Sequence, residues 1–343
     1  MKILIIGGTK FLGRHLVAAA QERNHKVTLF NRGKLSRENI EGVEQIYGDR
    51  NSDLDKLENR RWDAVIDTSG YLPQTVKLSA EALKDSVGQY VFISSISAYA
   101  DFSQPNFDET APIAELTEEQ QKKADSIELT GDIPAYALGE MYGALKVQCE
   151  RAAEKAMPGR VLNVRPGLIV GAFDPTDRFT YWTMRVAKGG EVLAPGESNR
   201  FVQLIDAGDL SEWIIKMTEQ GETGIYNANS KPFELTMGKI LEEIKNVSGS
   251  DAEFTWVSED FLKQENVMAW SEMPLYLPES EEGFRGFMSA NVDKALEKGL
   301  SFRPLSETIR ETLNWRKTKT DEMKAGISAE KEKELLRKWR ETA

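Results

Sequence analysis

Apolar residues occur in short continuous runs along the first half of the chain, and segments with helical spacing separate these runs. The runs lie at 2–6, 27–30, 64–67, 90–94 and 160–165. An apolar run of this length, ended by turn residues, is typical of a strand buried on both faces. Between the runs, apolar positions recur at helical spacing in 11–22, 52–60, 73–86 and 138–156. This alternation predicts βαβ units and therefore an α/β fold with a Rossmann-type, doubly wound parallel sheet.

Beyond Pro166 the pattern becomes irregular and richer in Gly, Pro and Trp. It predicts short strands at 201–205 and 224–227, and helices at 210–219, 234–247 and 329–341. A chain of 343 residues is too long for one ordinary core. We therefore expect a Rossmann domain over 1–170 to which 201–230 returns, a smaller mixed substrate-binding region over 171–315, and a helical extension over 316–343.

The segment 101–141 interrupts the regular pattern with ten acidic residues and two lysines. A solvated surface excursion is the favoured interpretation, because compact domains seldom contain long structureless loops. A lid over an active site is the alternative, since long loops in enzymes often carry function.

Charge and composition exclude several classes of protein. The formal net charge of −11 argues against a nucleic-acid partner, which needs a basic stripe. The single cysteine, Cys149, allows no intramolecular disulfide and fits a reducing compartment. No apolar run approaches the length of a membrane span, so we expect a cytoplasmic protein with no membrane partner. His15 and His25 are the only histidines, too few with Cys149 for a histidine-based zinc site, and no metal is expected.

A glycine-rich turn, GGTKFLG at 7–13, lies between the first predicted strand and the first predicted helix. A pyrophosphate needs a tight turn, close backbone approach and helix N–H groups that point at the anion. Gly8 and Gly13 have the spacing of a P-loop, but Arg14-His15 follows them in place of Lys-Ser/Thr. The turn therefore indicates a dinucleotide, with a glycine-rich turn that binds no nucleotide as the alternative.

The end of the second strand bears on the choice of dinucleotide. An acidic residue there accepts hydrogen bonds from the ribose of NAD, whereas basic residues suit the 2′-phosphate of NADP. This chain has Asn31-Arg32-Gly33-Lys34, and Lys10 in the glycine-rich turn adds a second phosphate partner. The sequence therefore predicts NADP, with NAD as the alternative.

Tyr142 and Lys146 are four residues apart on a predicted helix, so their side chains share one face. An ammonium near a phenol lowers the pKa of the phenol, which would make Tyr142 a general acid/base near neutral pH. Ser95 follows a parallel strand at the end where open α/β sheets bind ligands, and its hydroxyl can hold the substrate oxygen.

Four motifs together resemble the extended and atypical short-chain dehydrogenase/reductases. They are GGTKFLG, FISSISAYA at 92–100, YGALK at 142–146 and RPGLIVG at 165–171. The chain is most similar to the NAD-dependent epimerase/dehydratase group, including isoflavone-reductase-like members, from residue 1 to about residue 315. The resemblance implies that Ser95, not Ser94 or Ser97, is the catalytic serine beside Tyr142 and Lys146. It also implies a set of cofactor-binding residues: Gly7, Thr9, Lys10, Phe11, Leu12, Gly13, Asn31, Arg32, Asp49, Arg50, Thr68, Ser69, Gly70, Ser94, Pro166, Gly167 and Leu168.

The chain departs from the family pattern at three places. Lys10 stands where the middle glycine of the turn is expected, which marks an atypical member. The stretch from Ser95 to Tyr142 is longer than in the family. Ile96-Ser97 replaces the Asp-Glu pair of the sugar-nucleotide dehydratases, so a 4,6-dehydratase is disfavoured.

Arg178 and Arg200 are candidates for binding an anionic group of the substrate, with structural salt bridges as the alternative for both. Phe179, Tyr181 and Trp182 form either a pocket wall or simply core. We expect an NAD(P)-dependent oxidoreductase of the epimerase/dehydratase type that transfers hydride at a carbonyl or secondary alcohol of a small molecule, which includes sugar nucleotides. The alternative is a non-catalytic NAD(P)-binding regulatory or RNA-binding protein on the same fold. The resemblance also suggests a homodimer.

Overall fold

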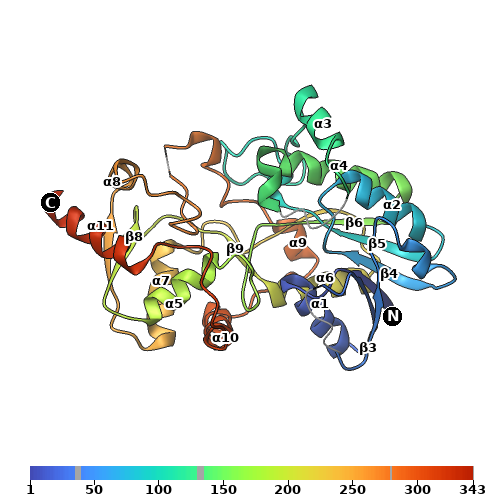
Figure 1. Cartoon of the computed structure of the whole chain (residues 1–343), viewed down its shortest axis with the longest axis horizontal. Helices are drawn as coiled ribbons and strands as arrows, with labels where there is room; N and C mark the ends of the chain where they lie inside the picture. Colours follow the sequence, from blue (N-terminus) through green and yellow to red (C-terminus); the bar gives the residue numbers. More distant parts are fainter. Residues whose placement is uncertain (35–39, 130–134, 279, 343) are drawn as a thin grey trace.

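A seven-stranded parallel sheet forms the centre of the larger lobe (Figure 1). The computed structural model describes residues 1–34, 40–129, 135–278 and 280–342. Within these residues the strand order is β3-β2-β1-β4-β5-β6-β10, so the order reverses between β1 and β4. The predicted Rossmann-type, doubly wound sheet is therefore confirmed. The strands are β1 (Lys2–Ile6), β2 (Lys26–Asn31), β3 (Val43–Tyr47), β4 (Trp62–Asp67), β5 (Val87–Ile93), β6 (Val161–Pro166) and β10 (Gly224–Ala228).

Helices cover both faces of this sheet, because its strands are apolar on both faces. Successive side chains of a strand point to opposite faces. In β1, Ile3 and Ile5 enter one core with the helices α1 (Phe11–Glu22) and α6 (Ala207–Glu219). Leu4 and Ile6 enter a second core with α2 (Pro73–Leu83) and α4 (Tyr142–Ala156). This pattern explains why the strands read as unbroken apolar runs.

The second lobe is smaller and mixed, and it holds α11 at the far left of Figure 1. Two short parallel pairs of strands lie outside the main sheet. They pair β7 (Leu168–Val170) with β9 (Leu204–Asp206) and β8 (Glu191–Pro195) with β11 (Glu253–Val257). The helices of this lobe are α5 (Arg178–Ala187), α7 (Met237–Ser248), α8 (Glu259–Gln264), α10 (Leu305–Lys317) and α11 (Ala329–Thr342). The short helix α9 (Asp293–Glu297) instead packs on the Rossmann lobe, where Ala295 joins the core that contains α1 and α6. Phe179, Tyr181 and Trp182 lie in the core of this lobe rather than along a pocket.

The chain returns from the second lobe to complete the Rossmann sheet. β10 pairs with β6 through Gly224↔Leu162 to Ala228↔Pro166. α6 packs against α1 on the same face of the sheet. The strand expected at 224–227 is thus the seventh strand of the sheet, while the domain boundaries given above remain a prediction.

Some elements differ from the sequence-based expectation. The helix expected over 52–60 is only a short 3-10 helix, η1 (Leu54–Leu57), in which Leu57 is the one buried residue. The strand expected over 201–205 begins at Leu204, and Phe201 forms only an isolated bridge with Thr236. The remaining 3-10 helices are η2 (Ile96–Ala98), η3 (Ala135–Met141) and η4 (Glu282–Phe284).

The acidic segment is anchored on both lobes rather than freely solvated. Its helix α3 (Glu118–Asp125) starts with a capping box between Thr117 and Gln120. The backbone N–H of Asn227 donates to a carboxylate oxygen of Glu109 at 2.7 Å. Phe102 and Phe107 are each only 9% exposed and pack in a small core with Tyr99. Most of the segment's described residues are exposed or half-buried, as the favoured interpretation of a surface excursion expects, and the buried rings of Phe102 and Phe107 attach it to the protein.

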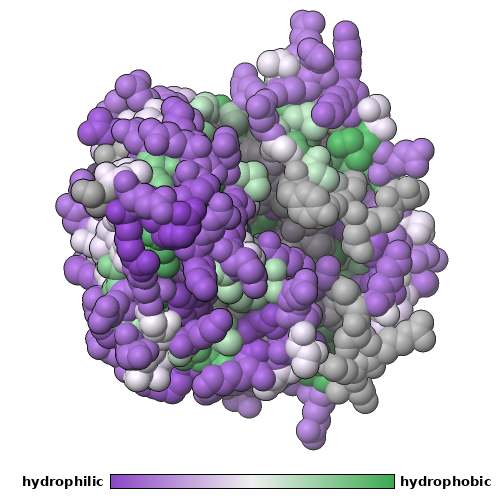
Figure 2. All heavy atoms as spheres, turned by 60° about the vertical axis from the view of Figure 1, so that its left-hand side comes forward, coloured by the Kyte–Doolittle hydropathy of each residue, from purple (hydrophilic) through white to green (hydrophobic). Residues whose placement is uncertain are grey.

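The face of the molecule drawn in Figure 2 is mainly hydrophilic, with hydrophobic residues only in scattered patches. Within the residues that the structure describes, no helix is both long enough and apolar enough to cross a membrane.

Candidate active site

The carboxyl ends of the central strands bring most of the predicted cofactor residues to one edge of the sheet. Gly7 follows β1, Asn31 ends β2, Thr68 follows β4, Ser94 follows β5 and Pro166 ends β6. All of these strands are parallel and hydrogen-bonded in one sheet. Residues that are far apart in sequence therefore meet where open α/β sheets bind their ligands.

The glycine-rich turn has a backbone that only glycine adopts easily at two positions. Gly7 and Gly8 have φ of 100° and 82°. A Cβ on Gly13 would lie 2.4 Å from the Cα of Gly8, so glycine is needed there for the helix to approach the turn. Lys10 has an ordinary extended φ of −112°, which explains why the middle position tolerates a side chain. The turn fits the pyrophosphate of a dinucleotide because its glycines have no side chain to keep the anion away from the backbone.

We expect the substitution Gly13→Ala to abolish dinucleotide binding. The added Cβ has no flexible neighbour to displace, since its nearest contacts are backbone atoms of Gly8. The turn or the helix α1 must then shift. Titration of NADPH by fluorescence measures the loss. The control is Gly283→Ala, at a glycine with open space around it and no positive φ, and unaltered NADPH affinity in the Gly13 variant would contradict the role of the turn.

Polar groups at the ends of β2 and β3 are consistent with an adenosine site. The side-chain oxygen of Asn31 accepts a hydrogen bond from the Gly33 N–H at 2.8 Å. The amide nitrogen of Asn31 is buried and has no hydrogen-bond partner among the described residues, so it can donate to a ligand. Asp49 lies in the turn after β3, where its carboxylate accepts from the Asn51 N–H at 2.9 Å. Arg32 is half-buried beside Asn31.

The guanidinium of Arg50 is bound by side chains of the protein itself. Its terminal nitrogens form two bonds to the carboxylate of Asp67, at 2.7 and 2.6 Å. Its Nε and Nη2 donate to Ser79, and its Nη1 also donates to Ser69. The guanidinium of Arg50 is thus used within the protein, and the expected cofactor role of this residue stays a prediction.

Tyr142 and Ser95 form a hydroxyl pair beside the end of β5. Ser95 precedes η2, and its Oγ accepts a hydrogen bond from the Ser97 N–H at 3.1 Å. The Ser95 side chain also lies close enough to the phenol of Tyr142, the first residue of α4, to lower the pKa of that phenol. Gly143 allows this approach, since a Cβ there would lie 1.9 Å from the carbonyl oxygen of Ser97. The structure thus brings the predicted serine and tyrosine together.

Lys146 lies one turn further along α4, and its side chain is buried. Its Nζ donates to the carbonyl oxygens of Gly70, at 2.8 Å, and Ile93, at 2.6 Å. The ammonium also lies 5.1 Å from the ring centre of Tyr71 and 4.6 Å from that of Phe92. An ammonium has three donors, so one remains for a ligand at this edge of the sheet.

The pKa values at this site differ from the expectation. Burial, followed by the charge of nearby Tyr71, raises the pKa of Tyr142, and the nearby Ser95 offsets this only in part. Burial lowers the pKa of Lys146. The prediction that Lys146 brings the pKa of Tyr142 down toward neutral is therefore wrong for this structure, because burial of the phenol outweighs the contributions that lower its pKa. Sequence reasoning also missed Tyr71, whose ring centre lies 6.5 Å from that of Tyr142.

The loop after β6 offers a further buried polar group. Gly167 donates its N–H to Ala228 at 3.1 Å, and a Cβ there would lie 1.8 Å from the side-chain nitrogen of Asn229. That nitrogen and the Oγ of Ser94 are both buried, and neither has a hydrogen-bond partner in the part of the chain that the structure describes. Pro166 thus ends β6, the strand next to β5 and Ser94, and Gly167 and Leu168 follow it. Asn229 is a polar neighbour of Gly167 that no sequence motif had marked.

Arg178 and Arg200 both belong to the second lobe, and each guanidinium lies over an aromatic ring. The Cζ of Arg178 is 4.9 Å from the ring centre of Trp270, and that of Arg200 is 5.1 Å from Tyr276. Arg178 is close enough to Tyr142 for the two charges to affect each other's pKa. Of the two, Arg178 is therefore the one with evidence of proximity to the catalytic tyrosine.

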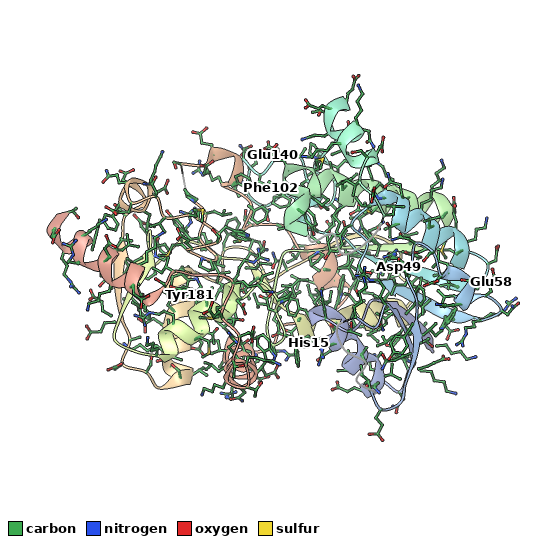
Figure 3. The ribbon with its side chains drawn as sticks, in the orientation of Figure 1. His15, Asp49, Glu58, Phe102, Glu140 and Tyr181 are labelled. Carbon is green, nitrogen blue, oxygen red and sulfur yellow. The ribbon has the colours of Figure 1, made fainter. Side chains whose placement is uncertain are left out.

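A contact between α1 and the loop after β7 joins the two lobes. The Nε2 of His15 lies 3.0 Å from the carbonyl oxygen of Ala172. The ring of Phe173 packs against His15 and under the guanidinium of Arg14. Figure 3 shows His15 below the junction of the lobes and Phe102 above it. The glycine-rich turn and the loop that leads to Arg178 are therefore held together.

The sheet order and the polar edge define a Rossmann-type α/β protein with a nucleotide-binding edge. A model of the NAD dependent epimerase/dehydratase family matches residues 3–228. The chain belongs to this family.

Two solved structures have the same fold as this chain, and one further protein is similar in sequence. The UDP-glucuronic acid 4-epimerase from Bacillus cereus, solved with NAD, has a TM-score of 0.65 at 16% identity. The match covers 93% of this chain and 99% of that chain. A human epimerase family protein solved with NADPH has a TM-score of 0.58 at 17% identity and covers 92% of this chain and 99% of that one. The chloroplast stem-loop binding protein of 41 kDa b from Arabidopsis thaliana is 32% identical over 114 residues. That match spans 29% of this chain and only 30% of the relative.

Proposed function

We propose that this protein is an NADP-linked oxidoreductase that transfers hydride at a carbonyl or secondary alcohol of a small molecule. The observation that carries the proposal is the placement of Ser95 and Tyr142 together at the carboxyl end of β5, where Gly143 lets α4 approach the segment after Ser95, with Lys146 one turn away. These groups lie at the edge where the glycine-rich turn would hold a dinucleotide. The family match and the cofactors of similar structures support the same reaction class.

The residues have separable roles in this reaction. The bound nicotinamide would supply or accept the hydride. Ser95 holds the substrate oxygen by a hydrogen bond, and Tyr142 gives that oxygen its proton. Because burial raises the pKa of Tyr142, the phenol is protonated at neutral pH, which suits carbonyl reduction. The remaining donor of Lys146 is free to bind a ribose hydroxyl and fix the orientation of the cofactor.

The same residues could serve a reductase or an epimerase. A reductase oxidises one NADPH per substrate, whereas an epimerase retains its cofactor over a full cycle. Absorbance of NADPH, followed with a panel of carbonyl substrates that includes sugar nucleotides, distinguishes the two. Failure to bind either NADPH or NADH would overturn the proposal altogether.

We expect Arg32→Asp to reverse the dinucleotide preference. The end of β2 carries Asn31 and Arg32 and no carboxylate, so the guanidinium would pair with the 2′-phosphate. Loss of this charged contact should weaken NADPH binding by about ten- to a hundredfold, while NADH binding changes little. Titration of both dinucleotides at one ionic strength measures the change.

Lys26→Asp is the matched control for Arg32→Asp. It makes the same change of charge at an exposed position at the opposite end of the same strand. We expect it to leave the preference unaltered. Tighter binding of NADH than of NADPH by the unmodified protein would contradict the proposed preference for NADP.

A non-catalytic RNA-binding protein is the second candidate function, and the name of the Arabidopsis relative favours it. The net charge of −11 opposes it. Filter binding of a stem-loop RNA at several salt concentrations tests it. Binding that falls steeply with salt and that survives Tyr142→Phe would favour this alternative.

A further inference from the structure

A buried ion pair joins the middle of α4 to β6, about two turns beyond Tyr142. The Nε and Nη2 of Arg165 donate to the two carboxylate oxygens of Glu150, at 2.9 and 2.7 Å. Arg165 and Glu150 are only 1% and 5% exposed. Lys146 and Glu150 follow Tyr142 at successive intervals of four residues, so the three side chains lie along one stripe of the helix. The ion pair therefore holds the side of α4 that carries the proposed catalytic groups.

The guanidinium of Arg165 also contacts the segment that begins with Ser95. Its Cζ lies 4.7 Å from the ring centre of Tyr99. Tyr99 directly follows η2, the short helix that Ser95 precedes. The hydroxyl of Tyr99 donates to the side-chain oxygen of Asn227 in β10 at 2.7 Å, which helps to fix the ring. Arg165 thus connects the helix that carries Tyr142 with the segment that carries Ser95.

Two contacts together set the position of α4 against η2. The first is the close approach of Gly143 to the carbonyl oxygen of Ser97. Glu150 lies seven residues, or about two helical turns, further along α4. A helix that touches its neighbour at one point can still rotate there, whereas a second contact two turns away prevents the rotation. Glu150, Arg165 and Tyr99 supply this second contact, and we call these three residues the α4 clamp.

Apolar packing constrains the rotation of α4 only weakly on this face of the sheet. Cys149 and Ala153 enter the core that α4 shares with α2, and Ala152 and Ala156 pack against its margin. These side chains are small, so they form shallow ridges that interdigitate little with their neighbours. The directional bonds of the α4 clamp are therefore needed to fix the helix about its axis.

The ion pair of the α4 clamp is poorly suited to stabilising the fold. Burial of two charges costs free energy that their attraction barely repays, and apolar residues of similar volume are often as stable. The Nη1 of Arg165 is also buried, with no hydrogen-bond partner among the described residues. An unsatisfied buried donor is a further cost. What the pair does provide is a defined geometry, because its two parallel hydrogen bonds are directional.

We infer that Glu150 and Arg165 are positioning residues that hold Tyr142 within reach of Ser95 for proton transfer. The inference rests on the proposed function, which makes Tyr142 the proton donor. Both residues act through α4 and not by contact with the substrate. Since a misplacement of about 1 Å costs about a hundredfold in rate, loss of the α4 clamp should affect kcat much more than binding.

The test replaces the ion pair by apolar residues of similar size. The double variant Glu150→Leu/Arg165→Met leaves no charge unpaired, so its melting temperature should lie within about 5 °C of that of the unmodified protein. Its kcat with an active substrate of the panel should fall by about ten- to a hundredfold. KM and the affinity for NADPH should change by no more than about threefold. A purely structural role would instead lower the melting temperature and kcat together.

A second buried ion pair provides the matched control. Arg185 and Glu332 bind each other in the second lobe at 2.6 Å. Arg185→Met/Glu332→Leu should leave kcat unaltered, whatever its effect on the melting temperature. Tyr99→Phe keeps the ring beside Arg165 and should retain most of kcat. Tyr99→Leu removes the ring and should lower kcat about fivefold, as expected for the loss of one cation–π contact.

A spectroscopic signal reports the surroundings of Tyr142 without any turnover. The NMR resonance of Tyr142 Cζ, in protein with labelled tyrosine, is assigned by its absence in Tyr142→Phe. It should shift in Glu150→Leu/Arg165→Met and stay in place in the control variant. This measurement does not depend on the proposed function. Failure to bind a dinucleotide or to turn over any carbonyl substrate would overturn that function, and the resonance would still decide the inference.

Either of two results would overturn the inference. One is a folded double variant that keeps the kcat of the unmodified protein or, where no substrate is turned over, its Tyr142 resonance. The other is a control variant that loses as much kcat as the double variant does. If Glu150→Leu/Arg165→Met does not fold, Tyr99→Leu takes its place in both comparisons.

Discussion

The variant Tyr142→Phe should lose about a hundred- to ten-thousandfold in kcat for hydride transfer while it binds NADPH as the unmodified protein does. The substitution removes only the phenolic hydroxyl that lies near Ser95. The ring stays in place beside Tyr71, so packing changes little. Steady-state rates with an active substrate from the panel, together with NADPH titration, measure the two quantities.

The pH dependence of the reaction tests the same tyrosine independently. Tyr142 acts as the proton donor, so its contribution is lost only as the pH rises through its pKa. Burial raises that pKa above the ordinary value of 10.0. Carbonyl reduction should therefore not slow between about pH 7 and about pH 9. Tyr226→Phe, which alters a tyrosine in β10, serves as the control, and unimpaired turnover by Tyr142→Phe would remove Tyr142 from the mechanism.

The variant Asp67→Ala should lower the free energy of unfolding by about 3–5 kcal/mol. Asp67 is fully buried at the end of β4 and binds the guanidinium of Arg50 with both carboxylate oxygens. The hydroxyl of Tyr90 donates to the same carboxylate at 2.7 Å. Its removal leaves a buried positive charge without a counter-ion. Urea denaturation followed by circular dichroism measures the loss.

Two further proteins make the Asp67 result interpretable. Asp63→Ala changes an exposed aspartate of the same strand and should cost less than about 1 kcal/mol. The double variant Arg50→Met/Asp67→Leu removes both charges and should recover most of the stability. If Asp67→Ala were as stable as Asp63→Ala, the ion pair would not be a major source of stability.

The pKa of Asp67 fixes the sign of the acid dependence. Burial alone would raise the pKa, but the charge and hydrogen bonds of Arg50, with the bonds from Tyr90 and Ser69, lower it below 3.8. The ion pair therefore stabilises the fold fully above the ordinary aspartate range. Its contribution is lost only as the pH falls through the lower value in the folded protein.

The Rossmann sheet could be predicted from sequence because its strands are buried on both faces. The run at 2–6 supplies Ile3 and Ile5 to one core and Leu4 and Ile6 to the other, so no polar residue interrupts it. The second lobe gave weaker signals. β8 includes a glutamate and a proline, and α10 buries Thr308, Thr312 and Arg316 beside only two aliphatic residues. Neither pattern indicates an element by periodicity alone.

The site was predictable where a residue's chemistry shows in local sequence, and not where it depends on distant partners. Ser95 and Tyr142 meet because one follows β5 and the other begins α4. The partners of Lys146 are backbone carbonyls of two different strands, which no motif reveals. Arg50 looked like a ligand residue because it follows β3, but its guanidinium forms an ion pair with Asp67 of β4. Trp270 lies more than ninety residues from Arg178, and only the fold joins them.

The late arrival of β10 bears on how the chain folds as it is synthesised. Until residue 228 has emerged, one edge of β6 has no hydrogen-bond partner, and the face of α1 that packs on α6 is uncovered. An open strand edge is a template for association with other chains. A fragment that stops near residue 170 would expose the same edge permanently. Expression of the nucleotide-binding half alone should therefore yield aggregated protein, whereas the chain through the second lobe closes its own sheet.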